Sequence, residues 1–205
     1  MVKWIGDRIS HEDKDGITTI VIRPIKNGWK EWLLTFWVFS FTFVGLVMIY
    51  LLFTDFEALN QGNNPDDETL QNQTIYAVVF IAFWAYFEYK TVKSLLWYKY
   101  GKELLMIDDE ALSIKKSILS YGKAQRYFFE NIKEFHQRKP EPTNFNNFFE
   151  NAYWAIGTDA LAFEYFGKQK SMGRRLTDQH GRLLLRLIDD RVRKKLKQKR
   201  KKEST

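Results

Sequence analysis

The chain has 205 residues, with 32 lysines and arginines against 25 acids and a net charge of +7. It contains no cysteine, which excludes disulfide bonds, thiolate metal sites and thiol catalysis. Residues 191–205 hold nine basic residues and one acid, a charge of +8, which leaves −1 for residues 1–190. The basic character therefore belongs to one tail, whereas a nucleic-acid-binding domain spreads its basic residues over a folded face.

Residues 1–28 are predicted to form an N-terminal β-hairpin. The run ITTIVI is rich in β-branched residues, which favour strands. It follows the turn Asp13-Lys14-Asp15-Gly16, in which Gly16 can adopt a positive φ. Pro24 ends the second strand.

Residues 29–53 are predicted to form a first transmembrane helix. Residues 32–53 are 22 residues without one charge. A helix of that length spans about 33 Å at roughly 1.5 Å per residue, which is enough to cross a hydrocarbon core of about 30 Å. Its apolar residues surround the helix, so no face is left for water.

Residues 74–97 are predicted to form a second transmembrane helix. Its strongly apolar part, 75–87, is too short to span unaided. Extension to Trp97 solves this, with Lys90 and Lys93 reaching back to the headgroups. Glu88 lies at the inner end of this span and is a candidate intramembrane polar site; the alternative is an ordinary residue at headgroup level.

The loops set the orientation of this hairpin. The connection 54–73 holds five acids and no lysine or arginine, which marks it as an extracytoplasmic loop. Basic residues flank the hairpin on both outer sides, namely Arg23, Lys26 and Lys30 before it and Lys90, Lys93, Lys99 and Lys102 after it. By the positive-inside rule both termini are cytoplasmic.

Residues 98–196 are predicted to be a cytoplasmic domain made mostly of strands. Alternating apolar and polar residues, separated by turn residues, indicate strands at 102–107, 111–118, 124–129, 131–138, 152–157 and 159–167. The last two are expected to pair around Thr158-Asp159. Thr177 is a plausible N-cap for a final helix, whose apolar stripe should lie against the sheets and comprises Leu184, Ile188, Val192 and Leu196.

The fold class is therefore a membrane α-helical hairpin plus an α+β cytoplasmic domain. The order of hairpin, GKELLMIDDEALSIKKS, FENIKEF, ALAFEYFGK and LLLRLIDDRV resembles the membrane-anchored bacterial PH-like proteins, including the YcxB-like group. The resemblance implies a PH-like β-sandwich or barrel closed by the C-terminal amphipathic helix. It also implies a place in the bacterial inner membrane and no catalytic residues.

The basic end of the chain, which leads into a tail at 197–205, is the first candidate site. Anionic lipids attract basic clusters close to a membrane, and an anchored domain keeps this cluster near one. The alternatives are a solvated tail, an acidic protein partner and nucleic acid, the last disfavoured because no aromatic residue interleaves for base stacking. The predicted lipid contacts are Arg191, Arg193, Lys194, Lys195, Lys197, Lys199, Arg200, Lys201 and Lys202.

The proline- and asparagine-rich stretch 139–151 is the second candidate site. Phe145, Phe148 and Phe149 are large apolar residues in a segment too irregular for a core strand. They could contact a partner or dip into the membrane. The alternative is that they fold back over the domain.

No spacing in the chain predicts a reaction. There is no phosphate-binding loop, no dinucleotide glycine motif and no metal-ligand spacing, so neither a cofactor nor a metal is expected. The function that this favours is a non-enzymatic scaffold or accessory subunit, bound to the bilayer and to protein partners of a membrane complex. An anionic-lipid-sensing module is the alternative, and a ribosome- or RNA-contacting protein a distant one. Homo-oligomerisation is left open.

Overall fold

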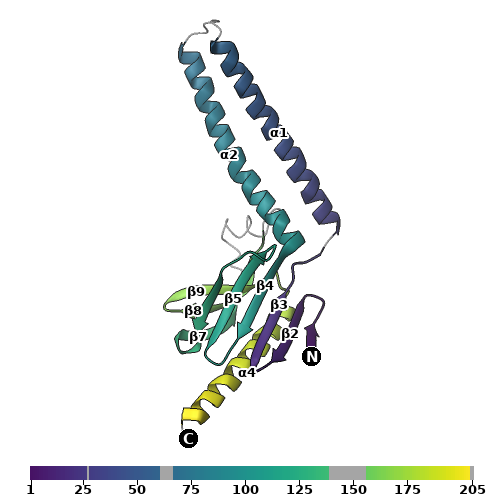
Figure 1. Cartoon of the computed structure of the whole chain (residues 1–205), viewed down its shortest axis with the longest axis vertical. Helices are drawn as coiled ribbons and strands as arrows, with labels where there is room; N and C mark the ends of the chain where they lie inside the picture. Colours follow the sequence, from purple (N-terminus) through teal and green to yellow (C-terminus); the bar gives the residue numbers. More distant parts are fainter. Residues whose placement is uncertain (27, 61–66, 139–155, 204–205) are drawn as a thin grey trace. The chain divides into compact units, whose positions relative to one another are not determined.

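A computed structural model describes residues 1–26, 28–60, 67–138 and 156–203 (Figure 1). The chain divides into two compact units. One unit comprises Met1–Lys26 and Leu96–Thr205 and contains every described strand and the C-terminal helix; we call it the β unit. The other, Asn27–Leu95, contains most of a helical hairpin.

The hairpin consists of α1 (Gly28–Asn60) and α2 (Asp67–Tyr100). Two stretches of 27 residues, Gly28–Thr54 and Thr74–Tyr100, are long and apolar enough to cross a membrane. Only 11% and 6% of their apolar windows are buried, whereas the core helix of a soluble protein is mostly buried. Both helices are longer than the predicted spans, because the acidic connection continues α1 as far as Asn60 and is helical again from Asp67.

Sheet A has six antiparallel strands in the order β1-β2-β3-β4-β5-β6. Strands β3 and β4, which flank the hairpin in sequence, are neighbours, with Thr18 opposite Ile107 and Ile22 opposite Glu103. The sequence predicted all of these strands except β1. Their bounds are β1 (Val2–Ile5), β2 (Ile9–Lys14), β3 (Ile17–Ile22), β4 (Gly101–Ile107), β5 (Ala111–Ile118) and β6 (Ala124–Phe128).

Sheet B has the order β7-β8-β9 and follows a short 3-10 helix, η1 (Phe129–Asn131). Its strands are β7 (Ile132–Gln137), β8 (Asp159–Tyr165) and β9 (Lys168–Arg174). The predicted pairing of 152–157 with 159–167 is wrong, because β8 pairs with β7 and β9 instead. Gly157, at φ +92°, bends the chain just before β8, and residues 152–155 lie outside the described part of the chain.

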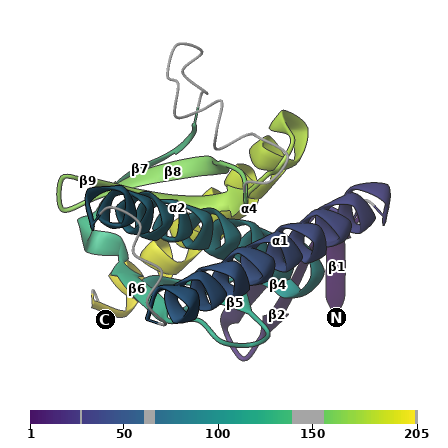
Figure 2. The same ribbon diagram turned by 90° about the horizontal axis from the view of Figure 1, so that it is seen from above.

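Helix α4 (Asp178–Glu203) begins as predicted, since the Thr177 hydroxyl accepts a hydrogen bond from the His180 amide at 3.3 Å. Leu184, Ile188 and Val192 are buried in one core with apolar residues of both sheets. The sheets remain separate, so the described strands form no closed barrel (Figure 2). The reason is local: after β6 the chain turns through η1 and starts a new sheet.

Candidate functional site

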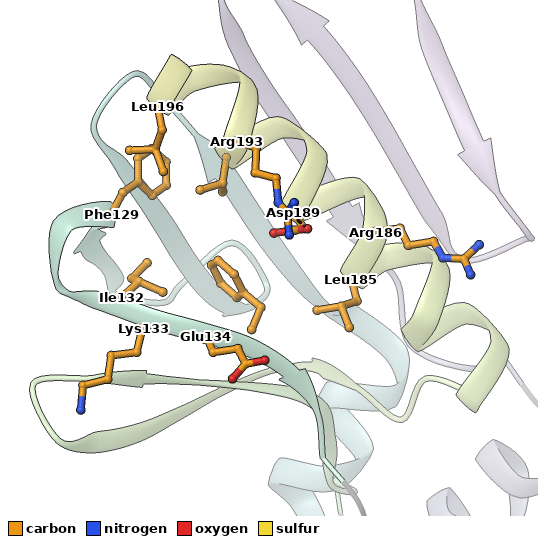
Figure 3. Close-up of a pocket in the computed structure, with 11 residues that line it drawn as sticks. Phe129, Ile132, Lys133, Glu134, Leu185, Arg186, Asp189, Arg193 and Leu196 are labelled. Atoms are coloured by element: carbon orange, nitrogen blue, oxygen red, sulfur yellow. Dashed lines mark ion pairs between the residues drawn. The ribbon is translucent and has the colours of Figure 1, made fainter. Parts of the chain in front are cut away.

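A groove of about 390 Å³ lies between α4 and the segment η1–β7 (Figure 3). Its apolar lining comprises Phe129, Ile132, Phe135, Leu185, Val192 and Leu196. Its charged lining comprises Lys133, Glu134, Arg186, Asp189 and Arg193. The lining therefore combines an apolar floor with charged side chains of both signs.

One wall of the groove is an edge strand. In sheet B, β7 pairs only with β8, so its other edge has no strand partner among the described residues. The pairing of β7 with β8 is irregular between Ile132 and Phe135, and such irregularities occur at sheet edges and near sites. An unpaired edge beside an apolar groove is the arrangement in which an extended peptide can bind.

The other wall is the basic helix. Arg193 and Asp189 form an ion pair at 2.8 Å along α4, one turn apart, and it lies at the groove (Figure 3). Arg186 extends away from the apolar lining at the rim in the same view. No carboxylate is paired with Arg186 in the part of the chain that the structure describes. The helix side of the groove therefore offers positive charge.

Three of the nine predicted lipid contacts are bound to the β unit's own acids. Arg191 pairs with Asp13 at 2.6 Å, and Lys199 pairs with Glu130 at 2.7 Å. Between them, Lys195 pairs with Asp109 at 2.5 Å and donates to the Gly16 carbonyl. We call these contacts the ion-pair ladder. The spacing of four residues places all three cations on one face of α4.

The ladder helps to lower the pKa of two of its acids, Asp13 and Glu130. Burial alone would raise the pKa of Asp13, but a hydrogen bond from Thr18 and the charge of Arg191 lower it below its ordinary value. The hydrogen bond and charge of Lys199 lower the pKa of Glu130. Both acids therefore stay charged wherever the β unit is folded at neutral pH.

The remaining basic residues of α4 lie elsewhere on the helix. Lys194, Lys197, Arg200 and Lys201 are exposed, and Arg193 pairs with Asp189. The side chain of Lys202 lies outside what the structure describes. The predicted lipid contact stays a prediction. If α4 contacts lipid while the ion-pair ladder is intact, the contacting side chains are the cations outside the ladder.

The ladder lies at one end of sheet A. Strand β3 starts at Ile17 and ends at Ile22, shortly before α1; β4 starts at Gly101, directly after α2. Gly16 and Asp109 lie beyond the opposite ends of these strands. Lys195 is therefore anchored about 20 Å along the sheet from the points where the chain leaves the β unit, at roughly 3.3 Å per residue.

A buried polar network joins the two sheets. Glu103 and Lys116 face each other on β4 and β5, at positions that alternation directs toward the core. Asp159, on β8, accepts hydrogen bonds from Lys116 at 2.5 Å and from the Ser171 hydroxyl at 2.6 Å. Glu103 is fully buried and accepts from the amides of Gly173 and Arg174. The network couples β4 and β5 to β8 and β9.

The two acids of this network titrate in opposite directions. Burial raises the pKa of Glu103, and the nearby cation Lys116 only partly opposes it. Burial would also raise the pKa of Asp159, but Lys116 and Arg174 lower it below its ordinary value. Sequence reasoning missed this network. The available signal was that Glu103 and Lys116 occupy inward-facing positions of β4 and β5, two otherwise regular amphipathic strands.

Glu88 lies between the two helices of the hairpin. The Thr42 hydroxyl of α1 donates a hydrogen bond to one carboxylate oxygen of Glu88. The other oxygen, Oε2, is buried with no hydrogen-bond partner among the described residues. One turn earlier, the Trp84 indole donates to the Phe41 carbonyl at 3.1 Å. Glu88 thus contacts the other helix, and its role as an intramembrane polar site stays a prediction.

The second predicted site is the proline- and asparagine-rich stretch 139–151. Phe145, Phe148 and Phe149 lie outside the described residues. Within the residues that are described, no three histidine, aspartate or glutamate side chains gather where they could hold a metal ion.

Comparison of the chain with protein-family models, curated proteins and solved structures finds no match.

Proposed function

We propose that this chain is an integral membrane protein that holds a protein partner at the membrane, as a scaffold or accessory subunit and not as an enzyme. The anchor is the hairpin, whose two candidate spans are apolar and largely exposed. We assign it to the PH-like membrane proteins of the YcxB-like kind, on the strength of its antiparallel sheets and C-terminal helix. A bacterial inner membrane is the location that this implies.

The charge pattern supports a cytoplasmic β unit. Lys26 and Lys30 flank the start of α1, and Lys99 and Lys102 flank the end of α2. The connection between the helices is acidic. Basic residues next to a span favour the cytoplasmic side, so both termini are cytoplasmic.

The groove between α4 and β7 is the observation that carries the docking function. Its apolar lining offers sites for side chains, and the free edge of β7 offers main-chain hydrogen bonds. The proposed occupant is an extended acidic segment of a partner protein. Charge complementarity selects it, because exposed cations predominate along α4 beside the groove, namely Arg182, Arg186, Arg193, Lys194, Lys197 and Arg200.

Site-specific photo-crosslinking in cells tests this docking site. A photoreactive amino acid replaces Leu185, in the groove lining, in the full-length chain. A second chain carries it at Lys123, an exposed position on the approach to β6. The groove position should give one dominant protein adduct that the Lys123 position does not give, and the crosslinked peptide should be acidic.

Charge reversal provides the matched control. With the crosslinker at Leu185, Arg186→Glu should lower the yield of this adduct at least about tenfold, equivalent to about 1.4 kcal/mol. Arg182→Glu makes the same change one turn earlier, outside the groove lining, and should have a smaller effect. Identical adducts from the groove and from Lys123, or equal effects of the two reversals, would contradict the proposal.

A further inference from the structure

The turn between β5 and β6 is a tight two-residue hairpin with an unfavourable sequence. Ile118 and Tyr121 close it by exchanging two backbone hydrogen bonds of 2.9 Å, and Leu119 and Ser120 lie between them at φ 50° and 72°. Positive φ at both central residues matches a type I′ turn, for which Asn-Gly is the preferred sequence. A leucine in this conformation is strained, because its Cβ approaches the following carbonyl oxygen. Leu119 therefore does not stabilise the turn through its backbone conformation.

The same turn exposes two large side chains with apolar surface. Tyr121 is 85% exposed and Leu119 is 51% exposed. Neither is among the described residues that form the core of the β unit or pack against it. An exposed apolar side chain on a strained backbone needs a reason outside the core, and such positions are often functional.

Strand register places the turn level with the end of the second candidate span. Ile118 pairs on one side with Gly101 of β4 and on the other with Tyr121. Gly101 directly follows Tyr100, which is the last residue of the span. The last turn of α2 belongs to the β unit, so this neighbourhood lies within one compact unit. Leu119 lies one residue beyond Ile118, past the level at which β4 begins.

The length of the span puts this end of α2 in the headgroup region once the hairpin is inserted. The 27 residues of Thr74–Tyr100 measure about 40 Å at roughly 1.5 Å per residue. A bilayer is about 40–45 Å thick when its headgroups are included. Tyr100 is 51% exposed, and tyrosine side chains are enriched at this interface. The β5–β6 turn, at the same level, therefore reaches the cytoplasmic headgroups.

The charge around the turn also suits a lipid surface. Residues 96–102 and 117–124 contain three lysines, Lys99, Lys102 and Lys123, and no acid. Lys99 and Lys123 are exposed. Basic side chains beside exposed apolar ones are typical of surfaces that lie on anionic membranes.

We propose that the β5–β6 turn is a membrane contact, in which Leu119 and Tyr121 enter the headgroup region of the cytoplasmic leaflet. The contact rests on the proposed membrane insertion of the hairpin and on a cytoplasmic β unit. It adds a third attachment to the two chain connections, between β3 and α1 and between α2 and β4. Its role is to stop the β unit from swinging about those connections.

Spin labels on the full-length protein in liposomes test this contact. Because the chain has no cysteine, single substitutions each place one nitroxide. One label is attached at Tyr121→Cys and the other at Lys14→Cys, an exposed position at the far end of β2. The liposomes contain phosphatidylcholine and phosphatidylglycerol. Collisions with a water-soluble nickel chelate should be several-fold rarer at Tyr121→Cys than at Lys14→Cys, while collisions with oxygen should be at least as frequent.

Replacement of the strained residues separates membrane contact from a structural role. Leu119→Asn with Ser120→Gly gives the preferred type I′ sequence. This exchange should raise the melting temperature in detergent, because strain is relieved. It should also bring the nickel collision rate at Tyr121→Cys close to that at Lys14→Cys. The matched control, Phe166→Asn, removes an exposed apolar side chain at φ 49° from the β8–β9 turn, at the end of sheet B away from α2, and should leave the label shielded.

Three results would overturn the contact. The first is an equal nickel collision rate at Tyr121→Cys and Lys14→Cys. The second is a low rate for both nickel and oxygen at Tyr121→Cys, which indicates burial against protein. The third is shielding that survives the exchange of Leu119 and Ser120 but is lost in Phe166→Asn.

Alkaline extraction of membranes separates this proposal from the one beneath it. Retention of the protein in the membrane pellet, combined with equal nickel collision rates at the two labels, would overturn the turn's membrane contact alone. Release of the protein by alkali would overturn the membrane insertion and the contact together.

Discussion

Arg191 donates a hydrogen bond to Asp13 at 2.6 Å, across 178 residues of sequence. The contact ties α4 to the β2 strand near the N-terminus, and Thr18 donates to the same carboxylate at 2.6 Å. Asp13→Asn should therefore loosen α4. Because the pair is partly exposed, the loss should be below about 1 kcal/mol and should shrink in high salt.

Hydrogen exchange of the full-length protein measures this effect. Amides of α4 beyond Arg191 should exchange faster in Asp13→Asn than in wild type. Asp15→Asn is the matched control, because Asp15 lies in the adjacent turn at φ 50° and asparagine tolerates that conformation. Equal exchange in the two variants would mean that the ion pair does not hold the helix.

The apolar stripe of α4 should contribute far more than the ladder. Ile188 is fully buried in the core shared by both sheets. Ile188→Ala should destabilise the β unit by about 2–5 kcal/mol, through lost burial and the cavity left behind. Leu183→Ala, at an exposed position on the same helix, should change stability by less than about 0.5 kcal/mol. Amide exchange in β4 and β8 checks both.

The regular strands and α4 could be predicted because their patterns are local. Strand β5 was predicted with its observed bounds, since Leu112 and Ile114 alternate with polar residues. Strand β9 was missed because Met172 and Gly173 are its only buried residues and it is an edge strand. Strand β1 was missed because it has four residues, of which only Ile5 is even partly buried.

The sites could not be predicted in the same way, because their partners are distant in sequence. The spacing of Arg191, Lys195 and Lys199 shows that they share a helix face, but no pattern shows that Asp13 and Asp109 meet that face. The groove depends on the packing of α4 against β7, and the buried Arg8 side chain donates to the carbonyls of Arg174 and Arg175, 166 and 167 residues away. Such contacts come from tertiary structure.

The raised pKa of Glu103 predicts a pH dependence of stability. A carboxyl group whose folded pKa exceeds its unfolded pKa binds its proton more tightly when folded, so stability falls as pH rises from the ordinary value of 4.5 through the folded value. Glu103→Gln removes this loss. Asp159, whose pKa is lowered, has the opposite effect on stability. Its contribution is lost as pH falls from its ordinary value of 3.8 through the folded value.

Thermal melting from about pH 5 to about pH 8 checks this prediction. Glu103→Gln should gain stability relative to wild type as pH rises, because glutamine keeps an oxygen for the amides of Gly173 and Arg174 and buries no charge. Glu134→Gln, the same exchange at an exposed site, is the matched control. Parallel curves for wild type and Glu103→Gln would contradict a raised pKa.

The close approach of α1 and α2 depends on Gly45. A Cβ atom at this position would lie 1.9 Å from the Trp84 ring, far inside van der Waals contact. Gly45→Ala should therefore push the helices apart or displace Trp84, and weaken the hydrogen bond from Thr42 to Glu88.

Because the chain has no cysteine, the paired substitutions Thr42→Cys and Glu88→Cys create the only possible disulfide. Oxidation in membranes should crosslink the pair readily with Gly45 present and several-fold less with alanine there. Gly28→Ala is the matched control, since nothing lies within 4 Å of its added Cβ. Equal crosslinking with Gly45→Ala and with Gly28→Ala would show that the two helices do not pack at Gly45.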